Sequence, residues 1–175
     1  MGKRARITLR HADASQAPKL HALISANLEE GRLLPRGLDD LTLHAARFVV
    51  AMRGRTIVGC ADLVPLSPQL AEVRSLAVDA NTRRSGIGAM LVEELRQRAR
   101  REGFEKLCAF THKPGYFSHM GFSIVPHLWL PEKIFSDCVK CPLFRRCGQF
   151  AMLLPLDASL PEAVDRDAAD AVRHV

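Results

Sequence analysis

The stretch that decides the fold is Leu76-Ala77-Val78-Asp79-Ala80-Asn81-Thr82-Arg83-Arg84-Ser85-Gly86-Ile87-Gly88-Ala89. A β-rich run ends at Val78, a polar loop follows, and Gly86-Ile87-Gly88 opens a long amphipathic helix. The first N–H groups of a helix have no intrahelical partners and lie at the positive end of the helix dipole. Glycines at this place leave room for a phosphate, so the stretch predicts an anion site suited to a pyrophosphate.

Two common phosphate-binding loops are excluded by the same residues. A Walker loop needs Gly-Lys-[Ser/Thr], which the sequence does not contain. A dinucleotide fingerprint needs a third glycine, and Leu91 occupies that position.

Working outward, hydrophobic periodicity and turn residues predict the other elements. The order describes one α/β domain over residues 1–156 with a mixed sheet flanked by helices, and an acidic, Ala/Asp-rich tail at 157–175 that we expect to be flexible. The expected elements are a strand at Ile7–Arg10, a helix from Ala17 to Leu28 closed by Gly31, a short helix at Leu38–His44, a hairpin of Phe48–Met52 and Ile57–Leu66, a strand at Ala71–Val78, a helix ending before Gly103, a strand at Lys106–Phe110, a short helix at Pro114–Met120, a strand at Gly121–Val125, an irregular segment from Pro126 to Gln149, and a strand at Phe150–Leu154.

Composition places the chain among ordinary globular proteins, with 47% hydrophobic and 25% charged residues in 175. No apolar run approaches the ~20 residues of a membrane-spanning helix, and the basic N-terminus leads into no signal peptide, so we expect a cytoplasmic protein. The net charge of +6 indicates an anionic partner, which can be nucleic acid, a phosphorylated cofactor or an acidic metabolite, or simply a solvated basic surface.

The cysteines argue against a disulfide framework, because five is an odd number and no secretory signal is present. Cys138, Cys141 and Cys147 form a C-x2-C-x5-C run, in which one pair has the spacing of a zinc knuckle. Zinc normally takes four ligands, so a further ligand would have to come from elsewhere in the chain, and His119, His127, Asp137 or Cys60 could complete the site in space. We therefore expect reduced thiols in a packed loop and no metal.

The segment Arg83-Arg84-Ser85-Gly86-Ile87-Gly88 matches [Gln/Arg]-x-x-Gly-x-[Gly/Ala], and the chain resembles the GNAT acetyltransferase superfamily from Ile7 to about Leu154. Tyr116–Phe122 looks like the aromatic-x-x-x-Gly-Phe motif of that family. The resemblance implies a mixed, mostly antiparallel sheet that is splayed in the middle, and acetyl-CoA as the cosubstrate.

The resemblance also implies roles for matching residues. A bulge near Leu76 would splay the sheet and leave an N–H that polarises the thioester carbonyl. The main chain of Leu76, Ala77 and Val78 would pair with the pantetheine arm. The N–H groups from Arg84 onward would hold the pyrophosphate. The remaining cofactor-binding residues would be Arg83, Arg84, Ser85, Gly86, Ile87, Gly88, Ala89 and Phe117.

Two further stretches resemble the acetyltransferase domain of short, stand-alone N-acetylglutamate synthases: Glu72–Val78 and Leu130–Pro142, the latter running on to Cys147. This resemblance implies direct attack by the α-amine of L-glutamate on acetyl-CoA in a ternary complex, the first step of arginine biosynthesis. Because only six residues precede Ile7, we do not expect arginine feedback through a preceding amino-acid-kinase domain.

An acidic amino acid carries two carboxylates, so its pocket needs guanidinium or ammonium groups. Arg10, Arg74 and Lys113 are the candidates for substrate binding, although each can equally be a solvated surface residue. The attacking amine has a pKa near ~10 and must lose a proton first. Glu72 is the candidate base, and the alternative is an ordinary glutamate at a strand end.

The resemblance to GNAT enzymes implies a catalytic tyrosine four residues before the glycine of Gly-Phe. This chain has Phe117 at that position, and Tyr116 is one residue early. A helix turns ~100° per residue, so Tyr116 need not point at the sulfur. Either Tyr116 protonates the leaving thiolate through a shifted register, or solvent does.

Two other functions remain open. The chain can acetylate another amine, such as a protein N-terminus, a lysine or a polyamine, or it can be a CoA-sensing or nucleic-acid-binding module. One Trp and one Tyr offer little surface for stacking bases, which argues against nucleic acid. The sequence is compatible with a homodimer.

Overall fold

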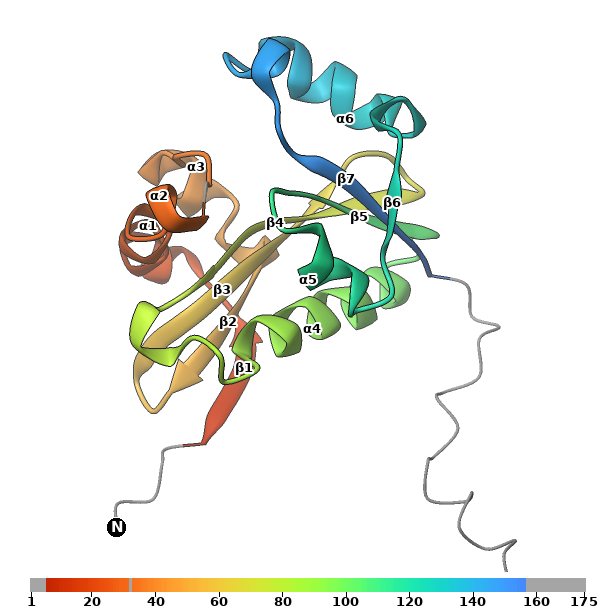
Figure 1. The fold of residues 1–175 in the computed structure, drawn as a ribbon. Helices are drawn as coiled ribbons and strands as arrows, with labels where there is room; N and C mark the ends of the chain where they lie inside the picture. The colour runs from red at the N-terminus through yellow and green to blue at the C-terminus, as the bar shows by residue number, and fades with distance from the viewer. Residues whose placement is uncertain (1–5, 32, 157–175) are drawn as a thin grey trace, which may run out of the picture.

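Seven strands form one sheet in the computed structural model, which describes residues 6–31 and 33–156 (Figure 1). In chain order they are β1 (Ile7–His11), β2 (Phe48–Arg53), β3 (Thr56–Pro65), β4 (Leu70–Val78), β5 (Lys106–Thr111), β6 (Ser123–Val125) and β7 (Phe150–Pro155). They lie side by side in the order β1-β2-β3-β4-β5-β7-β6. Only β4 and β5 pair in parallel, so the prediction of a mixed, mostly antiparallel sheet is confirmed.

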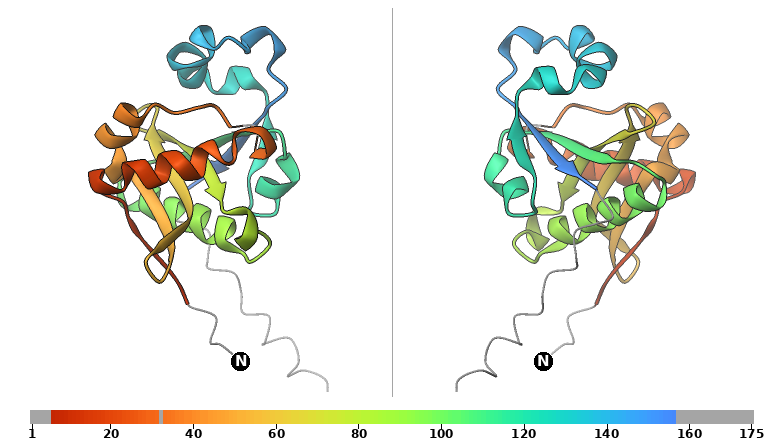
Figure 2. Two further views of the ribbon diagram at one scale, coloured as in Figure 1. Left: turned by 90° about the vertical axis from the view of Figure 1, so that its left-hand side faces the viewer. Right: turned by 90° about the vertical axis from the view of Figure 1, so that its right-hand side faces the viewer.

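Helices cover both faces of the sheet (Figure 2). Along β2, Val49 and Ala51 join a core that contains α4, whereas Val50 and Met52 join a second core that contains residues of α1 and α3. A strand covered on both sides is buried on both faces, and β2 is buried at each position from Phe48 to Met52, which explains its continuous apolar run. The helices are α1 (Ala17–Ser25), α2 (Leu28–Gly31), α3 (Leu38–Leu43), α4 (Ile87–Arg101), α5 (Pro114–Ser118) and α6 (Pro131–Ser136).

The long helix α4 has the predicted form. Its buried residues Ile87, Leu91, Leu95 and Ala99 repeat every four positions and pack against the sheet. The chain leaves the helix at Gly103, whose φ of 85° suits glycine.

The predicted single helix from Ala17 to Leu28 is wrong, because it is broken into α1 and α2. The break falls at Asn27, which is buried and whose side-chain amide donates to the Leu23 carbonyl at 2.8 Å. The Asn27 side chain thus donates to a carbonyl that a backbone N–H would bond in a continuous helix. Such a side-chain hydrogen bond competes with the next helical turn.

The predicted irregular segment between β6 and β7 is also more ordered than expected. It contains α6 and three 3-10 turns, and we call residues 126–149 the β6–β7 lobe. Figure 1 shows it standing above the end of the sheet. Pro131 starts α6 at a position where a missing N–H costs nothing. Leu130 anchors the lobe in a small core with Leu70, Cys108, Val125 and Ala151.

The domain extends at least to Leu156, whose N–H donates to the Glu105 carbonyl at 2.7 Å. The predicted tail at 157–175 lies outside the described residues. Within the ranges that the structure describes, no helix is both long enough and apolar enough to cross a membrane.

Candidate active site

The sheet opens in its middle, between β4 and β5. The two strands pair from Leu70 to Val73 and from Lys106 to Ala109. Beyond these residues, β4 continues along β3 to Val78, while β5 continues along β7 to Thr111. In the described chain no strand pairs with β4 on this side after Val73, so its main chain presents a strand edge that can bond the amides of a pantetheine arm.

A bulge in β4 accompanies the divergence, as predicted. Cys60 and Asp62 of β3 face Ala77 and Arg74 of β4, so β4 contains one extra residue between these pairs. Ser75 has a φ of 53°, which is uncommon for a residue other than glycine. Leu76 follows the bulge and is half-buried.

The loop after β4 turns its backbone toward the start of α4. Arg84 and Gly86 both have positive φ, at 60° and 80°. The Met90 N–H donates to the Gly86 carbonyl at 3.0 Å, so the N–H groups before Met90 precede the helical ladder. A hydrogen bond fixes the Arg83 side chain beside this loop, because its guanidinium donates to the Asn27 side-chain oxygen at 2.8 Å. The loop has the geometry expected of a pyrophosphate site.

The structure distinguishes the two neighbouring aromatic residues of α5. The hydroxyl of Tyr116 lies against Gly88, so closely that a β-carbon at position 88 would overlap it. Burial raises the pKa of this hydroxyl, which keeps it protonated at neutral pH. Phe117 is only 6% exposed and packs edge-on against Phe122, with ring centroids 5.2 Å apart. Tyr116 therefore reaches the start of α4, whereas Phe117 lies in the core.

Four charged side chains form a cluster beside the open end of β4: Glu72, Arg74, Lys133 and Asp137. The guanidinium of Arg74 donates to both Glu72 and Asp137. The ammonium of Lys133 donates to both oxygens of Glu72 at 2.9 Å and to Asp137 at 2.8 Å. Burial raises the pKa of Asp137, but bonds and charge from Lys133 and Arg74 leave it below its usual value. The structure thus brings together Glu72 and Arg74 with two residues that the sequence analysis missed.

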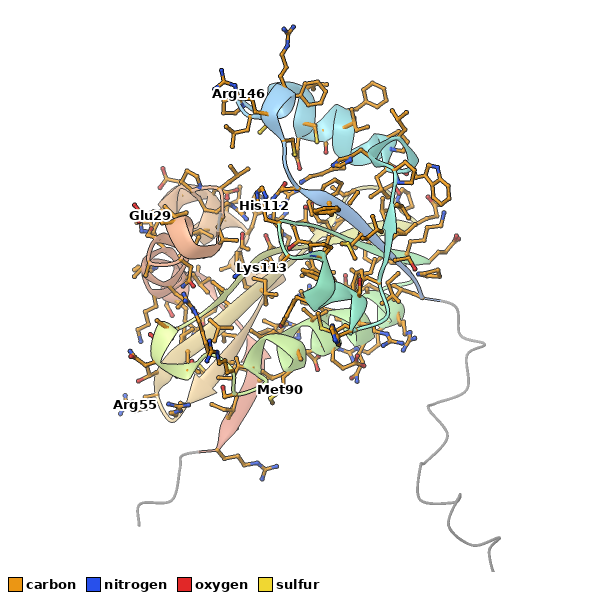
Figure 3. All side chains as sticks on the ribbon, viewed as in Figure 1. Glu29, Arg55, Met90, His112, Lys113 and Arg146 are labelled. Atoms are coloured by element: carbon orange, nitrogen blue, oxygen red, sulfur yellow. The ribbon has the colours of Figure 1, made fainter. Side chains whose placement is uncertain are left out.

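The other two candidates for substrate binding lie elsewhere. Arg10 is exposed on the edge strand β1, and β2 and β3 separate it from β4. The structure therefore does not bring Arg10 together with Arg74. Lys113 is exposed just after β5, on the side where the strands diverge (Figure 3).

Arg36 is a third basic residue at the open strand and was not predicted. It lies in the loop before α3, and its guanidinium donates to the hydroxyl of the bulge residue Ser75 at 2.9 Å. It also pairs with the fully buried Asp62 at 3.3 Å. Arg36 had no detectable signal in the sequence, because its loop has no motif and only the tertiary structure brings it to β4.

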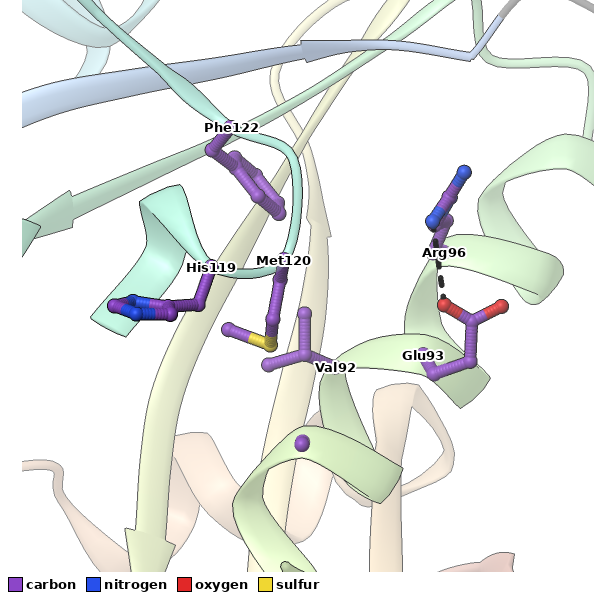
Figure 4. Close-up of a pocket in the computed structure, with 7 residues that line it drawn as sticks. Val92, Glu93, Arg96, His119, Met120 and Phe122 are labelled. Atoms are coloured by element: carbon purple, nitrogen blue, oxygen red, sulfur yellow. Dashed lines mark hydrogen bonds and ion pairs between the residues drawn. The ribbon is translucent and has the colours of Figure 1, made fainter. Parts of the chain in front are cut away.

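A hollow of about 410 Å³ begins within the first turn of α4, at Ala89 (Figure 4). Arg96 lines it and pairs with Glu93 at 3.4 Å, while its buried Nε has no hydrogen-bond partner among the described residues. The other lining residues are Ala89, Val92, His119, Met120 and Phe122.

The cysteines of the β6–β7 lobe form no disulfide within the described residues. Cys138 and Cys141 are half-buried, and Cys147 is exposed. In the part of the chain that the structure describes, no three His, Cys, Asp or Glu side chains are arranged to hold a metal ion.

Comparison with known proteins agrees with this geometry. Residues 17–122 match the acetyltransferase (GNAT) family. An uncharacterized N-acetyltransferase of Chlorobaculum tepidum is 31% identical over 85% of this chain and 96% of its own length. The amino-acid acetyltransferase of Pasteurella multocida is 30% identical over 72% of this chain, but the match spans only 29% of that longer protein.

Among solved structures, N-acetylglutamate synthase from Neisseria gonorrhoeae, complexed with coenzyme A and N-acetyl-glutamate, superposes with a TM-score of 0.78. It is 25% identical, and the match covers 89% of this chain and 36% of that one. A splayed sheet with a Gly-x-Gly loop at its opening defines a CoA-dependent acyltransferase, and the chain belongs to the GNAT family of acetyltransferases. It is an N-acetyltransferase with acetyl-CoA as its cosubstrate.

Proposed function

We propose that the protein acetylates the α-amine of L-glutamate, as the first step of arginine biosynthesis in the cytoplasm. The observation that carries this proposal is Arg74, a guanidinium beside the open end of β4 in a chain similar to amino-acid acetyltransferases. A guanidinium has five N–H donors. The contacts of Arg74 with Glu72 and Asp137 use Nε and Nη2, which leaves Nη1 for a substrate carboxylate.

The residues around the opening supply the steps of a direct transfer in a ternary complex. Acetyl-CoA provides the acetyl group as a thioester. Glu72 accepts the proton of the attacking ammonium through a water molecule, because the carboxylate itself is only 3% exposed. The Leu76 N–H donates to the carbonyl oxygen as negative charge develops there. Tyr116, kept protonated by its raised pKa, donates a proton to the departing sulfur.

A CoA-release assay with each of the twenty amino acids, two polyamines and a basic peptide tests the substrate. We expect L-glutamate to give the highest kcat/KM, with N-acetylglutamate identified as product by mass spectrometry. Turnover of polyamines or peptides without turnover of glutamate would refute the substrate and leave the enzyme class unchanged.

We also propose a homodimer formed through the β6–β7 lobe. Its large apolar side chains include Leu128, Trp129 and Phe135, which are 82%, 66% and 75% exposed. Large apolar patches on a protein surface usually mark an interface.

A further inference from the structure

Lys133 joins the β6–β7 lobe to the central sheet, and its place is set by three carboxylate oxygens. Its Nζ lies 2.9 Å from each oxygen of Glu72 and 2.8 Å from Asp137. The same ammonium lies 5.3 Å from the ring centroid of Phe110 on β5. The side chain is 12% exposed, so both its charge and its position are enclosed by the protein.

The donor capacity of Lys133 separates its role from that of Arg74. An ammonium has three N–H donors, and these three oxygens use all of them. Lys133 therefore has no donor left for a ligand. Arg74 is more exposed, at 27%, and retains Nη1 after its contacts with the same two carboxylates.

The charges of the cluster show what Lys133 contributes. The carboxylates of Glu72 and Asp137 place two negative charges beside the single positive charge of Arg74. Without Lys133, the three side chains would carry a net charge of −1 and would repel a substrate carboxylate. With Lys133 the cluster is neutral, and both carboxylates are held in the positions from which they orient the guanidinium.

We infer that Lys133 is a positioning residue for amino-acid recognition. It neutralises and fixes Glu72 and Asp137, so that Arg74 presents Nη1 to the carboxylate of the acceptor. This inference rests on the proposed function, because it presupposes an acceptor that carries a carboxylate.

Steady-state kinetics of three variants test the inference. Lys133→Met should raise the KM for L-glutamate about tenfold and leave the KM for acetyl-CoA within about twofold, since Lys133 contacts no residue assigned to acetyl-CoA. A lower kcat can accompany the change, because Lys133 also contacts Glu72, the proposed base. Lys133→Arg keeps the charge and should bring the KM for glutamate back to within about threefold of the wild type. Lys140→Met, which removes an exposed lysine from the same lobe, is the control and should behave like the wild type.

A double-mutant cycle with Arg74→Ala tests whether Lys133 acts through Arg74. In the Arg74→Ala background, Lys133→Met should raise the KM for glutamate by less than about threefold, because only the repulsion by the uncompensated carboxylates remains. A full tenfold effect in that background would overturn the inference, as would equal increases in both KM values. If circular dichroism shows that Lys133→Met is unfolded, Lys133→Gln carries the same expectations.

The wild-type substrate panel separates this inference from the proposed function. Glutamate turnover combined with an unchanged KM in Lys133→Met overturns the inference alone. If the wild type prefers another amino acid, the proposed substrate is wrong, and the double-mutant cycle of Lys133 and Arg74 is measured with that amino acid. A preferred acceptor without a carboxylate overturns both.

Discussion

The loop that we propose binds the pyrophosphate favours glycine at both Gly86 and Gly88, but for different physical reasons. A β-carbon at Gly86 would meet nothing within 4 Å, so its requirement is the backbone φ of 80°. Gly88 is required because Tyr116 approaches it closely. The sequence motif predicts glycine at both positions and does not separate these causes.

Gly86→Val should abolish binding of acetyl-CoA. A β-branched residue in the left-handed region costs roughly 1–2 kcal/mol or more, so the loop will leave the conformation that directs its N–H groups at the pyrophosphate. Isothermal titration calorimetry measures the loss, and circular dichroism checks that the fold is kept. Gly115→Ala is a suitable control, because that site is open and its φ is not positive. An unchanged Kd in folded Gly86→Val would contradict the assignment of the loop.

Tyr116→Phe should lower kcat by about ten- to a hundredfold, the range expected for loss of a general acid, with little change in acetyl-CoA affinity. Burial raises the pKa of Tyr116, so the hydroxyl is protonated at neutral pH and its contribution disappears only as pH rises above about 10. The pH profile of kcat should therefore lose its alkaline limb in the variant. An unaltered kcat and profile would assign protonation of the thiolate to solvent.

At the level of single residues, the sequence predicted those that belong to a continuous motif. The loop from Arg83 to Ala89 and the main chain after Arg74 could be proposed from the sequence because one strand, one loop and one helix contain them, and their roles stay predictions. Arg36 and Lys133 were missed because each reaches β4 from a separate loop or helix. Lys133 does lie within the Leu130–Pro142 stretch that carries the family resemblance. That stretch could have marked Lys133 as a candidate site residue, whereas a lysine alone could not.

At the level of elements, the β6–β7 lobe depends on charge as well as on apolar packing. The only large side chain of the described lobe that is fully buried is Leu130, while Lys133 and Asp137 bind the lobe to β4. The sequence could not predict α6, because its apolar residues Ile134 and Phe135 do not form a buried face. Ion pairs with a distant strand stabilise it, and periodicity does not detect such pairs.

Asp137→Asn should remove part of the acid sensitivity of the fold. The pKa of Asp137 is lowered by its cationic partners, so its contribution to stability is fully present above the ordinary value of 3.8 and is lost as pH falls below it. Urea unfolding between about pH 2.5 and 7 should show the wild type losing stability below about pH 4 more steeply than the variant. Parallel curves over this range would mean that Asp137 does not hold the lobe.

At the level of the whole molecule, the family resemblance predicted a splay of the sheet near Leu76, and the structure has its opening there, between β4 and β5. Element order and sheet type alone did not predict which strands diverge. They were not sufficient to place Arg10, because a strand's position in the sheet decides which of its side chains reach the centre. β1 lies at the edge of the sheet beside β2, with three strands between it and β5, and no local pattern contains that information.

The apolar surface of the lobe predicts self-association. Trp129→Ser combined with Phe135→Ser should shift the protein from dimer to monomer in size-exclusion chromatography with light scattering, because aromatic residues contribute most to interface energy. Leu34→Ser, an exposed leucine far from the lobe in sequence, serves as the control. A wild type that is monomeric at every concentration tested would exclude the lobe as a dimer interface.

The β6–β7 lobe leaves the sheet after Val125 and returns opposite it at Ala151, since these two residues are paired across β6 and β7. The ends of the excursion therefore lie within about 5.5 Å of one another, the spacing of residues paired in neighbouring strands. Such an insertion can lengthen, shorten or change its charges without moving either strand. Because Lys133 and Asp137 come from this lobe, a change in its length or charge alters the surroundings of Arg74 while the sheet that carries Arg74 stays in place.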